Sequence, residues 1–137
     1  YPIHADFAYM LSPLKFEELV LPYLKEYCLG LDYAIYHLDG VGQIPHLDHL
    51  LDVQELTGIQ WVPGAGQLGL ESPEWLHLYR KVQKRGKNLV LQGVTPNGAR
   101  FLLKNLKPKG LLLSTHCRSE AEARQLLKEF DKQTPRS

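Results

Sequence analysis

Residues 32–66 read DYAIYHLDGVGQIPHLDHLLDVQELTGIQWVPGAG and contain two consecutive strand-loop-helix patterns. Side chains over 33–39 alternate with the period of a strand, which puts His37 and Asp39 on one face near the end of that strand. A glycine follows at once, and apolar residues then recur at helical spacing over 44–51. The stretch therefore predicts a strand that delivers two polar side chains to a loop.

A second strand, predicted over 58–62, ends in the turn Pro63–Gly66. Parallel α/β proteins build their sites where consecutive strands end, because the carboxyl ends of those strands meet at one edge of the sheet. We therefore interpret residues 32–66 as the functional centre of the chain.

The remaining sequence repeats this pattern. Pairs of Ser-Pro or Thr-Pro at 12–13, 72–73 and 95–96 are typical of helix starts, since the hydroxyl caps the helix and proline suits its first turn. Helices are expected over 12–30, where Pro22 either kinks the helix or makes its first part a separate turn, and over 72–85, 95–106 and 119–132. Further strands are expected over 88–91 and 110–114. One helix followed by four strand-helix units predicts a single α/β domain over residues 1–137 with four parallel strands.

Composition excludes several classes of protein. The 137 residues carry 16 basic and 15 acidic side chains without a block of like charge, so nothing favours a nucleic acid or an anionic membrane as partner. No apolar run has the roughly 18 residues that a membrane span needs. Cys28 and Cys117 do not suggest a disulfide framework, and Cys28 is expected to be a small buried residue. These features together favour the cytoplasm.

The predicted carboxyl edge collects the residues with useful chemistry. It contains His37, Asp39, Gln60, Trp61, the turn 63–66, Gln92, Thr115, His116 and Cys117. His37 and Asp39 are interpreted either as site residues or as a polar pair that caps the following loop. Cys117 precedes a helix, a position that favours thiolate, so it is a ligand, a nucleophile or a small packed residue. His46 and His49 are either further metal ligands or surface and capping residues.

Trp61 with Gly64 and Gly66 suits a flat ligand, because an indole offers stacking area and glycine lets backbone N–H groups approach a polar group. Gln60 is predicted to hydrogen-bond that ligand or cofactor. The alternative is a packed tryptophan beside a turn that requires glycine for structural reasons. The turn matches neither a dinucleotide-binding fingerprint nor a phosphate-binding loop, since it lacks the spacing of both.

Three segments carry a resemblance to a known family: SPLKFEELVLPYLKEY at 12–27, YHLDG at 36–40 and IQWVPGAG at 59–66. Together they resemble the C-terminal half of the uroporphyrinogen decarboxylase superfamily. They are most similar to its branch of cobalamin-dependent (corrinoid) methyltransferases and relatives, some of which are labelled trimethylamine corrinoid proteins. The resemblance implies half of a (β/α)8 barrel of the TIM type, and an activity in corrinoid-linked one-carbon metabolism.

In that branch a His-x-Cys pair and a later cysteine bind zinc, which activates the thiol that accepts a methyl group from a corrinoid protein. The resemblance therefore implies a catalytic and zinc site of His37, Asp39 and Cys117, with Asp39 where the family has its first cysteine; zinc also accepts carboxylate. A corrinoid protein would be the partner. The half barrel is also expected to form a homo-oligomer or to bind the missing N-terminal half. The alternatives are a non-catalytic binding or assembly module, or a fragment of a longer decarboxylase-like enzyme.

Overall fold

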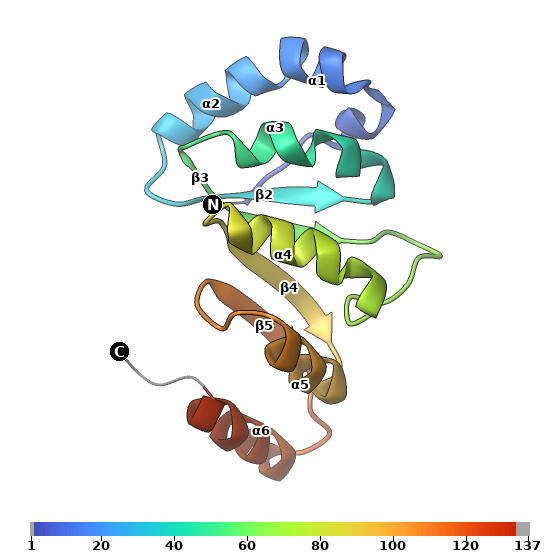
Figure 1. Ribbon diagram of the computed structural model, residues 1–137, viewed down its shortest axis with the longest axis vertical. Helices are drawn as coiled ribbons and strands as arrows, with labels where there is room; N and C mark the ends of the chain where they lie inside the picture. The colour runs from blue at the N-terminus through green and yellow to red at the C-terminus, as the bar shows by residue number, and fades with distance from the viewer. Residues whose placement is uncertain (1, 134–137) are drawn as a thin grey trace.

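A sheet of five parallel strands in sequential order forms the centre of the fold. The computed structural model describes residues 2–133, and its strands are β1 (Pro2–Ile3), β2 (Ala34–Asp39), β3 (Leu56–Val62), β4 (Asn88–Val94) and β5 (Leu111–Thr115). They pair in the order β1-β2-β3-β4-β5 (Figure 1). The predicted α/β class and the four strand-helix units are confirmed. The two-residue β1 is an addition, because so short a strand leaves no period in the sequence.

Within residues 2–133, five α-helices and three 3₁₀ helices precede or connect the longer strands, and a sixth α-helix follows β5. They are η1 (Asp6–Met10), α1 (Pro13–Leu19), α2 (Leu21–Leu29), η2 (Val41–His46), α3 (Leu47–Leu51), η3 (Pro73–Trp75), α4 (Leu76–Lys84), α5 (Pro96–Asn105) and α6 (Glu120–Gln133). The predicted caps are present, since the hydroxyls of Ser12, Ser72 and Thr95 accept hydrogen bonds from Lys15, Glu74 and Gly98 backbone N–H groups. The break between α1 and α2 falls at Val20, so that Pro22 lies in the first turn of α2, where its missing N–H is tolerated.

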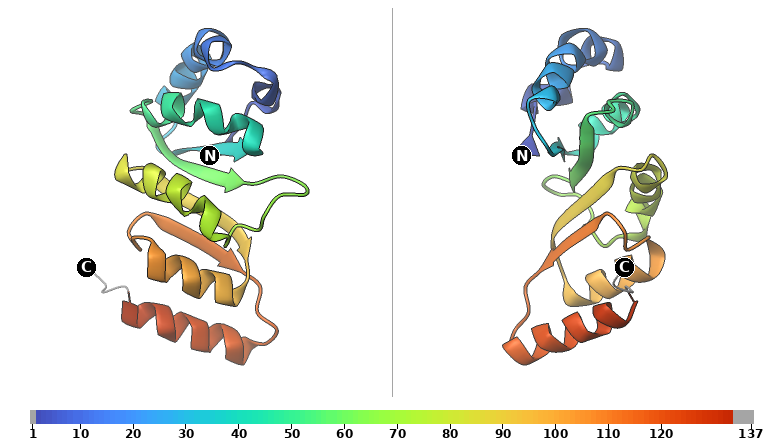
Figure 2. Two further views of the ribbon diagram at one scale, coloured as in Figure 1. Left: turned by 45° about the vertical axis from the view of Figure 1, so that its right-hand side comes forward. Right: turned by 90° about the vertical axis from the view of Figure 1, so that its left-hand side faces the viewer.

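The helices cover one side of the sheet, and the core lies between the two layers. Figure 2 shows the strands on the inner side of a curved arc and the helices on its outer side. Helix-facing side chains of β2, β3 and β4, among them Tyr36, Trp61 and Leu91, have no exposed surface. Cys28 of α2 also lies in this core, and burial raises the pKa of its thiol, as expected for a structural cysteine. No helix within residues 2–133 is long and apolar enough to cross a membrane.

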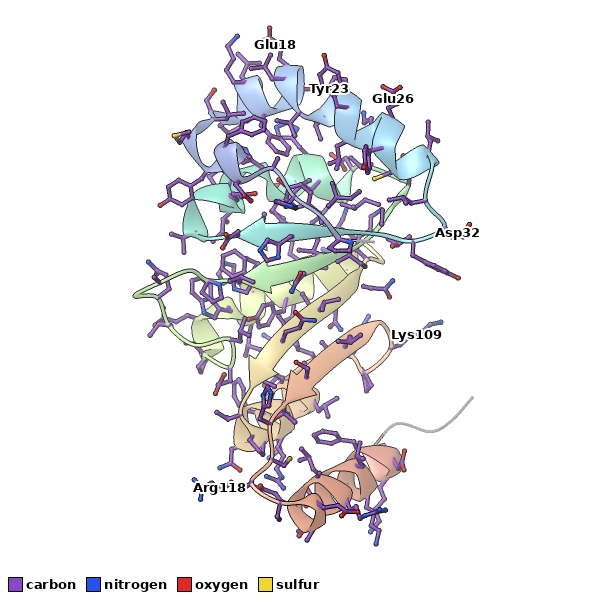
Figure 3. All side chains as sticks on the ribbon, turned by 180° about the vertical axis from the view of Figure 1, so that it is seen from behind. Glu18, Tyr23, Glu26, Asp32, Lys109 and Arg118 are labelled. Atoms are coloured by element: carbon purple, nitrogen blue, oxygen red, sulfur yellow. The ribbon has the colours of Figure 1, made fainter. Side chains whose placement is uncertain are left out.

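The other face of the sheet has no helical layer over it. Figure 3 looks onto this face, with Asp32 and Lys109 marking the amino edge of the sheet and Arg118 following β5 at the other edge. Its side chains are Ile35, His37, Asp39, Gln60, Val62, Val90, Gln92, Leu112 and Ser114, all half-buried or exposed. We call this the open face. Polar groups concentrate in its carboxyl half.

Candidate functional site

A chain of hydrogen bonds crosses three strands on the open face. The register pairs His37 of β2 with Gln60 of β3, which places the His37 Nδ1 atom 2.9 Å from the Gln60 Oε1 atom. Gln60 Nε2 in turn donates to Oε1 of Gln92 on β4 at 2.7 Å. This polar row results from period-two alternation in three adjacent strands, so the predicted meeting of His37, Gln60 and Gln92 at one edge is confirmed.

The orientation assigned to the Gln60 and Gln92 amides in this row selects one tautomer of His37. Because Gln60 uses its nitrogen as the donor to Gln92, its oxygen faces His37 and can only accept. The hydrogen of a neutral His37 imidazole therefore lies on Nδ1, and Nε2 carries a free lone pair. That nitrogen is suited to accept a proton or to bind a metal ion.

Asp39 ends β2 on the same face as His37. Its carboxylate has no hydrogen-bond or ion-pair partner among residues 2–133. The turns after β2 and β3 meet here: Gly40 and Gly64 have φ values of 82° and 93°, which favour glycine, and a Cβ on Gly64 would lie 3.6 Å from Gly40 Cα. Asp39 lines two hollows at the carboxyl edge.

Trp61 lies on the opposite side of β3 from Gln60. Its ring has no exposed surface and meets the Trp75 ring edge-on, with centroids 5.3 Å apart. The structure therefore places Trp61 in the core, as the alternative of a packed tryptophan predicts, and gives it no surface on which a ligand could stack. Of the predicted ligand wall, Gly64 lines both hollows beside Asp39, whereas Gly66 has an open position with φ 75°.

Cys117 lies apart from His37 and Asp39. It follows β5 and lines an apolar hollow of about 780 Å³ between α5, β5 and α6 together with His116. Two strands separate β5 from β2, so the two strand ends are about 14 Å apart along the sheet at about 4.8 Å per spacing. Zinc ligands must all lie about 2 Å from the ion. Among the residues described, no group of three His, Cys, Asp or Glu side chains could hold a metal ion.

His46 is a structural residue rather than a ligand in this arrangement. It is fully buried in η2, where its Nε2 donates to the Ala8 carbonyl at 2.8 Å and its ring stacks on Phe16 with centroids 4.3 Å apart. His49 lies on α3 near the same Phe16 ring at 6.5 Å. Both histidines face the α1 side and not the carboxyl edge of β3 and β4.

Three residues of the carboxyl edge have no counterpart in the expectations drawn from the sequence: Asp6, Tyr9 and Gln43 line the hollow beside Asp39. The available signal was Gly42, because a Cβ there would lie 2.3 Å from the Tyr9 ring. A glycine in that place indicates that another segment approaches closely.

Comparison of the chain with protein-family models, with curated proteins and with solved structures finds no match. The class of protein is therefore defined by its architecture alone: an α/β protein with an all-parallel sheet and its polar groups at the carboxyl edge.

Proposed function

We propose that the chain forms half of a (β/α)8 barrel and takes part in cytosolic, corrinoid-linked methyl transfer, as the resemblance to the uroporphyrinogen decarboxylase superfamily implies. One observation supports this best: strands in sequential parallel order, with helices on one face and the His37-Gln60-Gln92 row on the other. A doubly wound sheet reverses its strand order and has helices on both faces. A barrel keeps its strands in sequential order and its helices on one face of the sheet. Its active site lies at the carboxyl ends of the strands.

In this proposal His37 acts as the base. A methylated corrinoid on a partner protein would supply the methyl group to the sulfur of a thiol acceptor, and the residues of this chain would handle the thiol proton. The lone pair on His37 Nε2 takes the thiol proton, and Gln60 holds the ring through Nδ1. Gln60 is then a positioning residue, because it acts through His37.

We propose zinc binding only for the barrel that forms when this chain assembles with its missing half. His37 and Asp39 would supply two donors from one strand end, and zinc would supply activation of the thiol. Cys117 of the same sheet does not reach them. The proton transfer proposed for His37 belongs to the metal-free chain, because the Nε2 lone pair that would bind zinc could not also take a proton.

We expect the purified chain to accelerate methyl transfer from methylcobalamin to a thiol, followed by the change in the visible spectrum of the corrinoid. His37→Ala removes the base and should reduce the rate to that of buffer, whereas His77→Ala, an exposed histidine on α4, should leave it unchanged. Gln60→Leu should retain part of the activity, because the imidazole remains but is no longer oriented.

Equal rates for the unmodified chain and His37→Ala would contradict the proposed base. A rate no higher than that of buffer for the unmodified chain, measured with and without added zinc, would favour the non-catalytic alternative.

That alternative, a half barrel that serves in assembly, is favoured by the apolar surface at both ends of the sheet. At the β1 end, a hollow of about 570 Å³ is lined by Phe7, Leu19, Tyr23 and Tyr27, all of which are about half exposed or more. At the β5 end, Leu127 of α6 lines the hollow of about 780 Å³ and is 64% exposed. Strand edges and apolar surfaces of this kind favour pairing with another chain.

We therefore expect light scattering to report a mass of two or more 15.6-kDa chains at micromolar concentration. Leu127→Glu should shift the protein toward the monomer, because a charge in an apolar interface is costly. Leu14→Glu is the matched control, since Leu14 is 70% exposed on α1 and lines neither hollow. A stable monomer of the unmodified chain would contradict this expectation.

A further inference from the structure

Two hollows that share part of their lining lie along the carboxyl edge of the sheet. Their volumes are about 310 and 520 Å³, within the range of small-molecule sites. Both are lined by Asp39, Pro63, Gly64, Ala65 and Gln67; the first also reaches Asp6, Tyr9 and Gln43, and the second Glu71 and Gly93. We call the two hollows together the carboxyl-edge groove.

The loop that forms one wall of the groove is held by hydrogen bonds to the helices behind it. Trp75 Nε1 donates to the Leu68 carbonyl at 3.3 Å, and Tyr79 Oη donates to the Leu70 carbonyl at 2.7 Å. Glu71 accepts a hydrogen bond of 2.9 Å from the Thr95 hydroxyl. The wall is thus fixed in place before any ligand arrives, which lowers the entropic cost of binding.

The groove has negative charge without a compensating cation. Its lining includes the carboxylates of Asp6, Asp39 and Glu71 and no lysine, arginine or histidine within the residues described. His4 lies just outside and donates to Asp6 at 3.0 Å, and Glu71 is bound to Thr95, so Asp39 is the carboxylate without a partner. Such a groove attracts cations and repels phosphates and carboxylates.

Gln43 adds a hydrogen-bond donor to the groove. Its side chain is only 1% exposed, and its Oε1 accepts a hydrogen bond of 3.0 Å from Tyr36 Oη. Burial, with Asp6 nearby, holds the pKa of Tyr36 well above its usual range, so the hydroxyl stays protonated and donates. The Gln43 amide nitrogen has no partner among residues 2–133 and is not sealed from the hollow that it lines. Water can occupy this position when the hollow is empty, and an acceptor atom of a bound molecule can replace that water as the partner of Gln43 Nε2.

We propose that the carboxyl-edge groove binds a small organic ammonium ion that carries a neighbouring oxygen, such as an amino alcohol. The ammonium group pairs with Asp39, and the oxygen accepts a hydrogen bond from Gln43 Nε2. Tyr9, whose ring lies against Gly40 and Gly42, forms the side wall of this site. The site rests on the groove alone and is independent of the proposed methyl transfer.

The test is a titration of the ¹⁵N-labelled chain with 2-aminoethanol at millimolar concentrations, observed in ¹⁵N–¹H correlation spectra. The Gln43 side-chain amide signals should shift and saturate, whereas ethylene glycol and glycolate, which lack the cation, should produce no saturable shift. Asp39→Asn preserves shape and should weaken binding about ten-fold by removing a charge-assisted hydrogen bond. Glu74→Gln, an exposed carboxylate outside the groove, should bind as the unmodified chain does.

Three outcomes would overturn the site. They are an absence of saturable shifts, equal binding of ethylene glycol, and equal weakening by Asp39→Asn and Glu74→Gln. Because well-dispersed spectra of Asp39→Asn report folding directly, a lost interaction is distinguished from a lost structure.

Discussion

Trp61→Ala is expected to lower the free energy of unfolding by about 3–5 kcal/mol, the range for truncation of a large buried aromatic residue. The Trp61 indole has no exposed surface and packs edge-on against Trp75 between the sheet and α4. Its removal leaves a cavity that the strand, held in register on both sides, cannot close. Urea unfolding followed by circular dichroism measures the change without relying on tryptophan fluorescence.

Trp61→Phe is the informative companion. The Trp61 Nε1 group is buried without a hydrogen-bond partner in the described structure, which costs about 1–3 kcal/mol. Phenylalanine removes that unsatisfied donor and leaves a smaller gap than alanine, so this variant should stay within about 1.5 kcal/mol of the unmodified chain. A Trp61→Ala variant with nearly unchanged stability but no binding at the carboxyl edge would contradict the packing role of Trp61 and support its predicted role in the ligand wall.

The sheet and its polar row were predictable because they depend on local patterns. Alternation with a period of two places His37, Asp39 and Gln60 on one face whatever the rest of the chain does. The same alternation already puts Trp61 opposite Gln60, so the pattern also contained the evidence that the indole faces the helices.

Other features depend on contacts that no local pattern records. The distance between Cys117 and His37 follows from the order of the strands in the sheet. Local sequence patterns do not specify that order. Gln43 is fixed by the hydroxyl of Tyr36, seven residues earlier on the helix-facing side of β2. Tyr9 reaches the same hollow from η1, after a strand of two residues. Contacts between side chains from separate loops produce no periodic pattern in the sequence. At most, a glycine marks the place where another segment approaches closely, as Gly42 does for Tyr9.

Gly58→Val is expected to lower the free energy of unfolding by about 3 kcal/mol, at the upper end of the range for overpacking. A Cβ at Gly58 would lie 2.8 Å from the Asn88 carbonyl oxygen and 2.7 Å from Ile35 Cδ1. The Ile35 side chain can move, but the Asn88 carbonyl belongs to the backbone of β4. Relief of the clash therefore requires β3 and β4 to separate where they pair.

The sign of this effect decides between two physical causes. Strand propensity alone predicts a gain in stability, since valine favours a strand and glycine weakens it by about 0.5–1 kcal/mol. The close approach of β4 predicts a loss of stability, and we expect this loss to exceed the gain. Gly30→Ala is the matched control: Gly30 has φ −84° and its nearest contact is at 3.7 Å, so alanine should be neutral or slightly stabilising. A stabilised Gly58→Val would show that β3 and β4 are not in close contact.

Gly58 lies at the amino edge of the sheet, so a substitution there can change the stability of the fold without changing binding at the carboxyl edge. Asn88 lies between two glycines at the amino edge, since a Cβ on Gly110 would lie 2.8 Å from Asn88 Oδ1, and Asn88 Nδ2 donates to the Thr57 carbonyl at 2.9 Å. This end of the sheet is closed by backbone contact, whereas the carboxyl edge is hollowed beside Asp39. Gly58→Val should therefore require less urea to unfold, yet its folded fraction should bind 2-aminoethanol with unchanged affinity. A parallel loss of affinity in folded protein would mean that the two edges are coupled through β3.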